Sequence, residues 1–181
     1  EKNLPLRWSA EDNIAWKLDI PPWGNSSPVV IGDRIYLTTQ TDDTSLQVLA
    51  VDRIQGTLLW QRSVGKGRLK THSLHNMATP TVVADEERVW ALFGTGHLAC
   101  LSVDGKELWN KNMQQEHGEY KIKWGMGSSL VLHNGLVYVV CMHTAQSYVL
   151  ALDGKTGEQA WKSERGFPAE REGRDAYSTP I

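Results

Sequence analysis

A tryptophan follows a glycine by four residues at three places in the chain, and an aspartate precedes each glycine. The three sets are Asp52, Gly56 and Trp60; Asp104, Gly105 and Trp109; and Asp153, Gly157 and Trp161. Together with Trp16, the tryptophans are spaced 44, 49 and 52 residues apart. A period of about 40–50 residues with four short strands per unit is typical of propeller blades. The sequence is therefore predicted to be a repeat protein.

Each repeat unit contains four short runs that are predicted to be strands, because apolar and polar residues alternate along them. Turn residues join the first two strands of each unit and favour tight hairpins: Gly32-Asp33, Asp85-Glu86-Glu87 and Asn134-Gly135. The predicted strands are 27–31, 34–39, 46–51 and 58–63, then 79–84, 88–93, 97–103 and 107–110, then 128–133, 136–141, 147–152 and 159–162. We therefore predict an all-β protein, a β-propeller of four-stranded antiparallel blades with no long helix.

The residue types in the repeated set have a structural explanation. A carboxylate at the end of a third strand can accept N–H groups of the following turn, and glycine supplies a left-handed backbone there. The tryptophan then lies on the fourth, outermost strand, where its ring can cover the neighbouring sheet. We expect Trp60, Trp109 and Trp161 to be mostly buried packing residues rather than catalytic ones.

Two of the three sets resemble a known repeat motif. Ala50-Val51-Asp52, Gly56 and Trp60, and likewise Ala151-Leu152-Asp153, Gly157 and Trp161, are similar to the tryptophan-docking motif A-x-D-x-x-T-G-x-x-x-W of pyrroloquinoline-quinone-like (PQQ-like) propeller repeats. In the middle unit Ser102 stands at the alanine position and the turn is shortened to Asp104-Gly105. The wider sequence resembles secreted bacterial propellers of the BamB-like type. This resemblance indicates the fold more than the function, since propellers carry unrelated activities.

The count of units leaves both ends of the chain incomplete. We assign blades to residues 24–64, 78–111 and 127–163, and partial strands to residues 13–18 and 178–181 of a single propeller segment spanning 1–181. The resemblance implies a ring of seven or eight blades. We expect the chain to be part of a larger ring, or a second copy to complete it as a homo-oligomer, because open ends expose strand edges and apolar faces.

Charge and hydropathy argue against a nucleic-acid partner and against a membrane-spanning helix. The net charge of −2 gives no basic field for nucleic acid. No apolar run approaches the roughly eighteen residues of a membrane span. Cys100 and Cys141 lie within apolar strands and are predicted to be buried thiols rather than a disulfide. The resemblance implies a periplasmic or secreted protein.

The long connections indicate where a binding site would lie. Because strands alternate in direction, residues 65–78, 112–127 and 164–176 are predicted to project from one face, and long loops on a rigid scaffold often carry recognition. The candidate ligand contacts on this face are His72, His75, Asn76, Trp124, Arg174 and Asp175. The His72 and His75 pair has no visible third ligand, so we predict hydrogen-bonding histidines and no metal site. Trp124-Gly125 repeats Trp23-Gly24, which favours a packing role for Trp124.

No catalytic residues can be assigned, because the sequence has neither a nucleophile elbow nor an identifiable pair of carboxylates. The resemblance implies a non-enzymatic extracytoplasmic scaffold, similar to BamB-like assembly proteins, that binds protein or carbohydrate without a cofactor. The alternative is a fragment of a PQQ- and calcium-dependent quinoprotein dehydrogenase. Dehydrogenases that resemble this family hold PQQ against two adjacent cysteines. The two cysteines here are not adjacent, which favours the scaffold.

Overall fold

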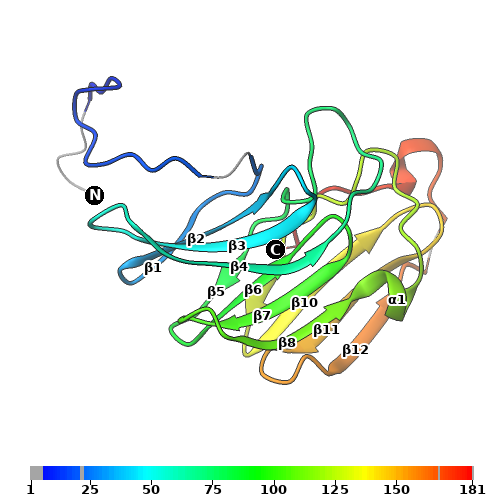
Figure 1. Cartoon of the computed structure of the whole chain (residues 1–181). Coiled ribbons are helices and arrows are strands. Elements are labelled where there is room, and N and C mark those ends of the chain that lie inside the picture. Colours follow the sequence, from blue (N-terminus) through cyan, green and yellow to red (C-terminus); the bar gives the residue numbers. More distant parts are fainter. Residues whose placement is uncertain (1–5, 21–22, 167, 181) are drawn as a thin grey trace.

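The chain folds into three consecutive four-stranded antiparallel sheets. The computed structural model describes residues 6–20, 23–166 and 168–180. The first sheet contains β1 (Val29–Ile31), β2 (Arg34–Gln40), β3 (Ser45–Asp52) and β4 (Leu58–Lys66). The second contains β5 (Val83–Ala84), β6 (Arg88–Leu92), β7 (His97–Ser102) and β8 (Glu107–Asn112). The third contains β9 (Val131–His133), β10 (Leu136–Met142), β11 (Ser147–Asp153) and β12 (Gln159–Glu164). The predicted all-β architecture of four-stranded blades is confirmed (Figure 1).

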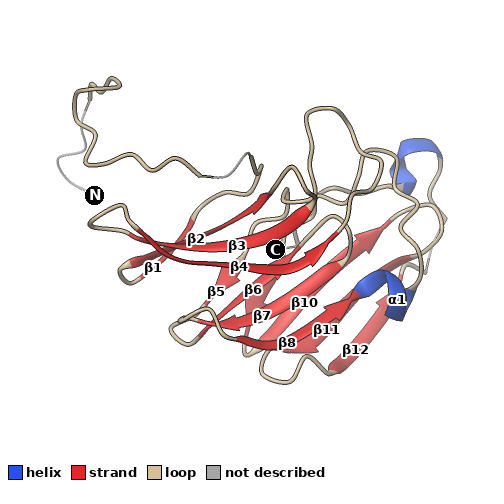
Figure 2. Ribbon diagram, viewed as in Figure 1, coloured by secondary structure: helices blue, strands red, loops and turns tan. Residues whose placement is uncertain are grey.

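Two short helical segments interrupt the loops. Helix α1 (Met113–His117) follows β8, and the 3-10 helix η1 (Arg171–Arg174) lies in the last loop (Figure 2). Asn112 caps α1 by accepting hydrogen bonds from the backbone N–H groups of Gln114 and Gln115. Within the described residues, no helix has the length and hydropathy needed to cross a bilayer.

The sheets stack face to face as propeller blades do. The first strands lie nearest one another, since β1 contacts β5 and β5 contacts β9. Alternation along β6 buries both faces of the middle sheet: Val89 and Ala91 enter the core shared with the first sheet, while Trp90 and Leu92 enter the core shared with the third. Because successive side chains of a strand point to opposite faces, the middle sheet contributes to two apolar layers, one on each side of it.

Trp16, and the tryptophans on the outer strands β4 and β8, each pack on a glycine of the sheet that follows them in the chain. Trp16 packs on Gly56, Trp60 on Gly105 and Trp109 on Gly157. The glycines have φ of +69°, +80° and +71°, and an added Cβ would meet the indole Cδ2 at 2.3, 2.8 and 2.8 Å. In each case the indole N–H donates to a backbone carbonyl of the same turn, at Arg53 (2.9 Å), Val103 (2.8 Å) and Gly154 (3.1 Å). Glycine is required because a side chain would occupy the space of the ring.

The first strands are shorter than predicted because the residues before them bond to the next sheet. The backbone N–H of Ser27 donates to Thr81 Oγ1 (3.0 Å), that of Thr81 to Ser129 Oγ (3.0 Å), and that of Ser129 to Thr179 Oγ1 (3.2 Å). These equivalent residues form a hydroxyl ladder that joins successive sheets at their innermost edges. The predicted strands over 27–31, 79–84 and 128–133 therefore begin two to four residues later.

The predicted partial strands at the two ends are not strands in the described part of the chain. Residues 13–18 have no strand partner and are held by the ring of Trp16. Residues 178–180 are likewise extended without pairing, although Thr179 joins the hydroxyl ladder. Ile181 lies outside the described residues. A strand requires a hydrogen-bonded neighbour on a sheet, and in the described residues neither segment has one.

The expectation that all three repeated tryptophans are mostly buried is wrong for Trp161. Trp60 is 9% exposed and Trp109 is half-buried, but Trp161 is 43% exposed. The physical reason is that Trp60 and Trp109 are each covered by the following sheet. Trp161 lies on β12 of the third sheet, and its ring packs against that of Tyr138, with centroids 5.9 Å apart.

The strand register corrects the alignment of the middle unit. Trp109 pairs with Cys100 as Trp60 pairs with Ala50, so Cys100 rather than Ser102 occupies the alanine position. Ser102 takes the place of the turn aspartate, and its hydroxyl accepts the Lys106 N–H (3.1 Å). Asp104 instead forms an ion pair with Arg34 of the first sheet (3.1 Å).

Candidate functional site

The three long loops gather at one end of the sheets and contact one another (Figure 2). Trp124 lies where the first two loops meet: Thr71 Oγ1 donates to the Trp124 carbonyl (2.7 Å), and the His72 N–H donates to it as well (3.3 Å). The second loop is joined to the third because the Lys123 N–H donates to Asp175 Oδ2 (3.0 Å). These bonds fix the backbone on both sides of the Trp124 ring.

An aromatic depression opens between these loops. It has a volume of about 390 Å³ and is lined by His72, His75, Trp124 and Tyr177. The rings of His72 and Trp124 meet edge to face with centroids 5.4 Å apart, and His72 and His75 meet similarly at 6.4 Å. The structure thus brings together three of the six residues predicted as ligand contacts.

The two histidines already use one ring nitrogen each within the loop. His72 Nδ1 accepts the Leu74 N–H (3.2 Å), and His75 Nδ1 lies 3.3 Å from Thr79 Oγ1. Because His72 Nδ1 is an acceptor, its proton lies on Nε2 in the neutral ring. In the parts of the chain that the structure describes, no three His, Cys, Asp or Glu side chains gather closely enough to hold a metal ion.

The other three predicted contacts lie elsewhere. Asn76 is buried and holds the backbone, because its amide donates to the Trp23 carbonyl (2.7 Å) and accepts the Ala78 N–H (2.9 Å). Arg174 turns toward its own loop and donates to the Ala169 carbonyl (3.1 Å). Asp175 lies behind the depression, where it joins the second and third loops.

Sequence reasoning missed Tyr177, and it gave Trp124 a packing role as well as a place among the candidate contacts. Tyr177 directly precedes residues 178–180, and its aromatic side chain was the feature of the sequence that could have indicated a binding residue. Trp23 pairs with Gln40 beside the first sheet. The Trp124 ring lines the depression and is 41% exposed, and the Trp23 ring is 42% exposed in a separate hollow, so both Trp-Gly tryptophans lie partly at the surface.

Positive charge lies beside the depression and on the first loop. Arg68 and Lys70 are exposed on the first loop, and residues 65–78 include no Asp or Glu. The Lys123 ammonium lies 4.6 Å from the centroid of the Trp124 ring, within the range of a cation–π contact. Leu74 adds an exposed apolar side chain on the same loop. The surface therefore combines aromatic and apolar groups with cations.

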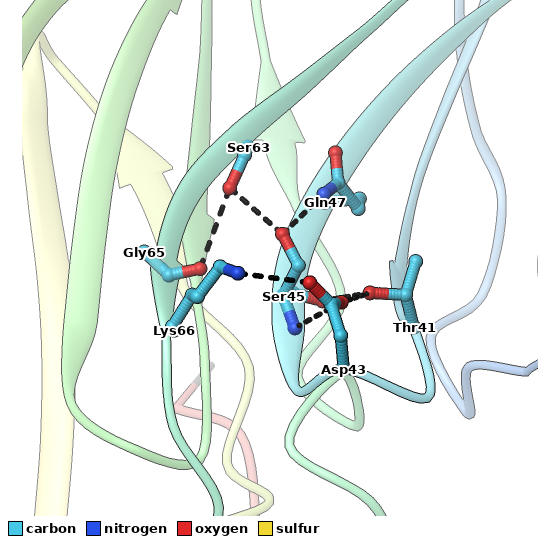
Figure 3. A network of polar contacts seen from close by, with 7 residues as sticks. All are labelled: Thr41, Asp43, Ser45, Gln47, Ser63, Gly65 and Lys66. Carbon is cyan, nitrogen blue, oxygen red and sulfur yellow. Dashed lines mark hydrogen bonds and ion pairs between the residues drawn. The ribbon is translucent and has the colours of Figure 1, made fainter.

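A polar network anchors the start of the first loop (Figure 3). Lys66 Nζ lies 2.8 Å from Asp43 Oδ2, and Asp43 also accepts hydrogen bonds from the Thr41 hydroxyl and the Ser45 N–H. Lys66 first, and then Thr41, lower the pKa of Asp43 to about 2. Ser45 Oγ in turn lies 2.9 Å from Ser63 Oγ on β4. The hairpin between β2 and β3 is thus joined to the residue from which the loop departs.

The fold and part of its sequence are shared with known proteins. The family described as outer membrane protein assembly factor BamB matches residues 6–163. No curated protein matches the chain. BamB from Moraxella catarrhalis has a similar structure, with a TM-score of 0.50 and 18% identity over 77% of this chain and 36% of that one.

Two alcohol dehydrogenases share the same sheet arrangement. The quinohemoprotein alcohol dehydrogenase ADHIIG from Pseudomonas putida HK5 has a TM-score of 0.61 and 19% identity over 88% of this chain and 24% of that one. The quinohemoprotein alcohol dehydrogenase from Comamonas testosteroni has a TM-score of 0.57 and 18% identity over 80% and 21%. The chain therefore spans about a third or less of these structures. At these identities the likeness establishes the propeller-like fold alone.

Proposed function

Because the chain belongs to the family described as outer membrane protein assembly factor BamB, we propose that it is part of a non-enzymatic scaffold of the bacterial envelope, periplasmic or secreted, that binds another protein through its loop end. The observation that carries this proposal is the aromatic depression lined by His72, His75, Trp124 and Tyr177. It lies on loops that are held together by hydrogen bonds before any partner arrives.

The chemistry of the surface suits a protein partner. Tryptophan, tyrosine and arginine carry much of the affinity at protein interfaces, and preorganised loops reduce the ordering cost of binding. The Lys123 ammonium, 4.6 Å from the centroid of the Trp124 ring, places positive charge beside the depression. The matching partner segment carries an apolar side chain for the depression and carboxylates for the rim.

Photo-crosslinking in the envelope of the producing bacterium tests this proposal. A photoreactive side chain at Leu74 should capture a specific protein, and Trp124→Ala or Lys123→Glu should each reduce the yield. Lys155→Glu, at the opposite end of the sheets, is the matched control and should leave the yield unchanged. Equal capture with Trp124→Ala would contradict the proposal.

Carbohydrate is the alternative partner at the same depression, because sugar rings can also lie against exposed aromatic groups. A neutral glycan gains little from the surrounding cations. Lys123→Glu should therefore weaken a protein partner strongly, since rim charges act on charged partners. The same substitution should leave a neutral glycan nearly unaffected.

A quinoprotein dehydrogenase fragment is the second proposal, favoured by the structural likeness to the enzyme from Pseudomonas putida HK5. Calcium requires about six to eight oxygen ligands. The described residues gather no acidic cluster of that kind, so they do not fit the metal by themselves. Dye-linked alcohol oxidation with added PQQ and calcium is the test, and turnover that depends on Trp124 would overturn the scaffold proposal.

We also propose that the outer face of the third sheet is covered in the assembled protein. Trp161 is exposed there, and Val131, Leu132, His133, Tyr138 and Pro180 line a cavity of about 370 Å³ beside it. A second copy is the occupant that the chain itself offers. Sedimentation equilibrium should detect association that weakens with Trp161→Ala, and a monomer at all concentrations would exclude it.

A further inference from the structure

A buried polar cluster lies between the second and third sheets, beneath α1. It consists of His117, Tyr120, His143 and Tyr148, with the Cys141 thiol beside the two phenols. The rings of His117 and Tyr148 have centroids 5.4 Å apart, and those of Tyr120 and His143 are 5.7 Å apart. Tyr148, His143 and Tyr120 are only 1%, 2% and 8% exposed.

Each ring of this cluster carries a buried polar atom that makes no hydrogen bond of ordinary length within the protein. These atoms are His117 Nε2, Tyr120 Oη, His143 Nε2 and Tyr148 Oη. Elsewhere among the described residues, only Ser128 Oγ is in the same situation. An unsatisfied buried polar group costs about 1–3 kcal/mol, and native proteins leave few of them. Four such atoms in one contiguous cluster indicate a place built to receive a hydrogen-bonding guest.

The cluster offers mainly donors. His143 Nδ1 accepts the N–H groups of Ala145 (3.2 Å) and Gln146 (3.3 Å), so the ring proton lies on Nε2, which donates. Burial lowers the pKa of His143, which keeps the ring neutral. Burial, and then the neighbouring Cys141, raise the pKa of both Tyr120 and Tyr148. Both phenols therefore keep their protons, and the Tyr148 hydroxyl lies near enough to the Tyr120 hydroxyl and the Cys141 thiol to interact with both, but without a hydrogen bond of ordinary length.

A surface cavity adjoins the cluster. It has a volume of about 250 Å³, and His143 and Tyr148 belong both to its lining and to the cluster. Arg165 lies in the same lining. The Lys162 ammonium is 4.7 Å from the centroid of the Tyr148 ring, and Lys162 is paired with Glu164 (3.4 Å). Glu164 lies in the same lining, and Arg165 donates to the carbonyls of Gly173 (3.2 Å) and Arg174 (3.4 Å), so a guest would share these cations with acceptors of the protein.

We infer that the buried polar cluster and the adjoining cavity form a binding site for a small carboxylate of about the size of formate or acetate. The carboxylate oxygens would accept hydrogen bonds from His143 Nε2–H and the Tyr148 hydroxyl, with Lys162 and Arg165 supplying positive charge. Charge-assisted hydrogen bonds of this kind are stronger than neutral ones. The site is separate from the aromatic depression and does not depend on the proposed scaffold function.

Titration of the whole chain with sodium formate, at constant ionic strength maintained with chloride, tests the inference. Long-range proton–nitrogen NMR spectra should show a saturable shift of His143 Nε2, while acetamide, a neutral molecule of similar shape to acetate, should produce none. Tyr148→Phe should weaken the apparent affinity about tenfold, the effect of one lost hydrogen bond to a charged group. Tyr138→Phe on β10, which contacts Trp161 instead, is the matched control and should bind formate normally.

Thermal unfolding with and without formate gives a second measurement that does not rely on NMR. Formate should raise the midpoint for the unaltered chain and for Tyr138→Phe, but less for Tyr148→Phe and Tyr120→Phe. The inference is overturned if no saturable shift occurs, if Tyr148→Phe binds as well as the unaltered chain, or if acetamide is equally effective. The last result would identify a chamber for neutral guests such as water.

Discussion

The cost of removing a repeated tryptophan should depend on whether another sheet covers it. Trp60 and Trp161 occupy equivalent positions in the first and third sheets. Trp60 is 9% exposed, packs on Gly105 and donates to the Val103 carbonyl at 2.8 Å. Trp161 is 43% exposed, and its ring packs against that of Tyr138 in its own sheet.

These surroundings give different magnitudes. Trp60→Ala removes a ring that is enclosed on both sides, and such truncations cost about 3–5 kcal/mol. The Val103 carbonyl keeps a partner in Arg34 (2.7 Å), so no orphaned acceptor adds to that cost. Full burial of a large apolar side chain contributes about 1.5–3 kcal/mol, so the half-covered Trp161 should lose only about 1 kcal/mol. We therefore expect a difference of about 2 kcal/mol or more between the two variants.

Urea unfolding measures the difference, provided that far-UV circular dichroism is the probe. Tryptophan fluorescence is unsuitable because each variant removes a fluorophore. The slope of each transition should also be compared, since loss of the contact between two sheets can uncouple repeat units. Equal costs for the two substitutions would refute the reasoning that the following sheet, rather than the motif itself, creates the stability.

Three further perturbations test local features. Gly105→Ala should destabilise the chain by at least about 1 kcal/mol more than Gly32→Ala in urea unfolding. Both glycines have positive φ, which costs an L residue roughly 1–2 kcal/mol, but only at Gly105 would the added Cβ meet an indole ring. Burial raises the pKa of Cys100 to about 12 and of Cys141 to about 11, so neither thiol should react with a disulfide reagent in the native state. The free energy of unfolding should also fall as the pH rises past 9.0, because the unfolded thiols ionise there while the folded ones do not. Rapid labelling without denaturant would contradict their burial. Backbone N–H groups of the turn after β11 lower the pKa of Asp153 below 3.8. The contribution of the Asp153 carboxylate to the free energy of unfolding should therefore be present above pH 3.8 and vanish as the pH falls through the lower, folded-state pKa. Asp153→Asn should flatten this part of the pH dependence of the urea midpoint.

Local sequence predicted the hairpins and the layered core well. Gly32-Asp33 and Asn134-Gly135 specify their turns through residues a few positions apart, and alternation along β6 specifies which side chains face each neighbouring sheet. The errors came from relations between units. The length of the first strands depends on hydroxyl bonds between residues about fifty positions apart, and the exposure of Trp161 depends on a neighbour that follows the third sheet.

The candidate site was predictable only in outline. Loop length and residue type identified the face and brought attention to His72, His75 and Trp124. Asn76 has the same polar character but is buried as a backbone support, and nothing in its local sequence distinguishes the two roles. Tyr177 reaches the depression from the third loop, about fifty residues beyond Trp124. Its role depends on tertiary approach and has no local signature.

The hydroxyl ladder through Ser27, Thr81, Ser129 and Thr179 has a consequence for how such a chain can evolve. Every rung uses an amide of one unit and a hydroxyl of the next, so the joint has a direction and each unit brings both halves of it. Duplicating or deleting one whole unit in the gene would leave every remaining rung with a matching partner. A serine or threonine two positions before the inner strand is thus enough to make a new copy compatible with its neighbours. The number of copies can then change by recombination without first inventing a new junction.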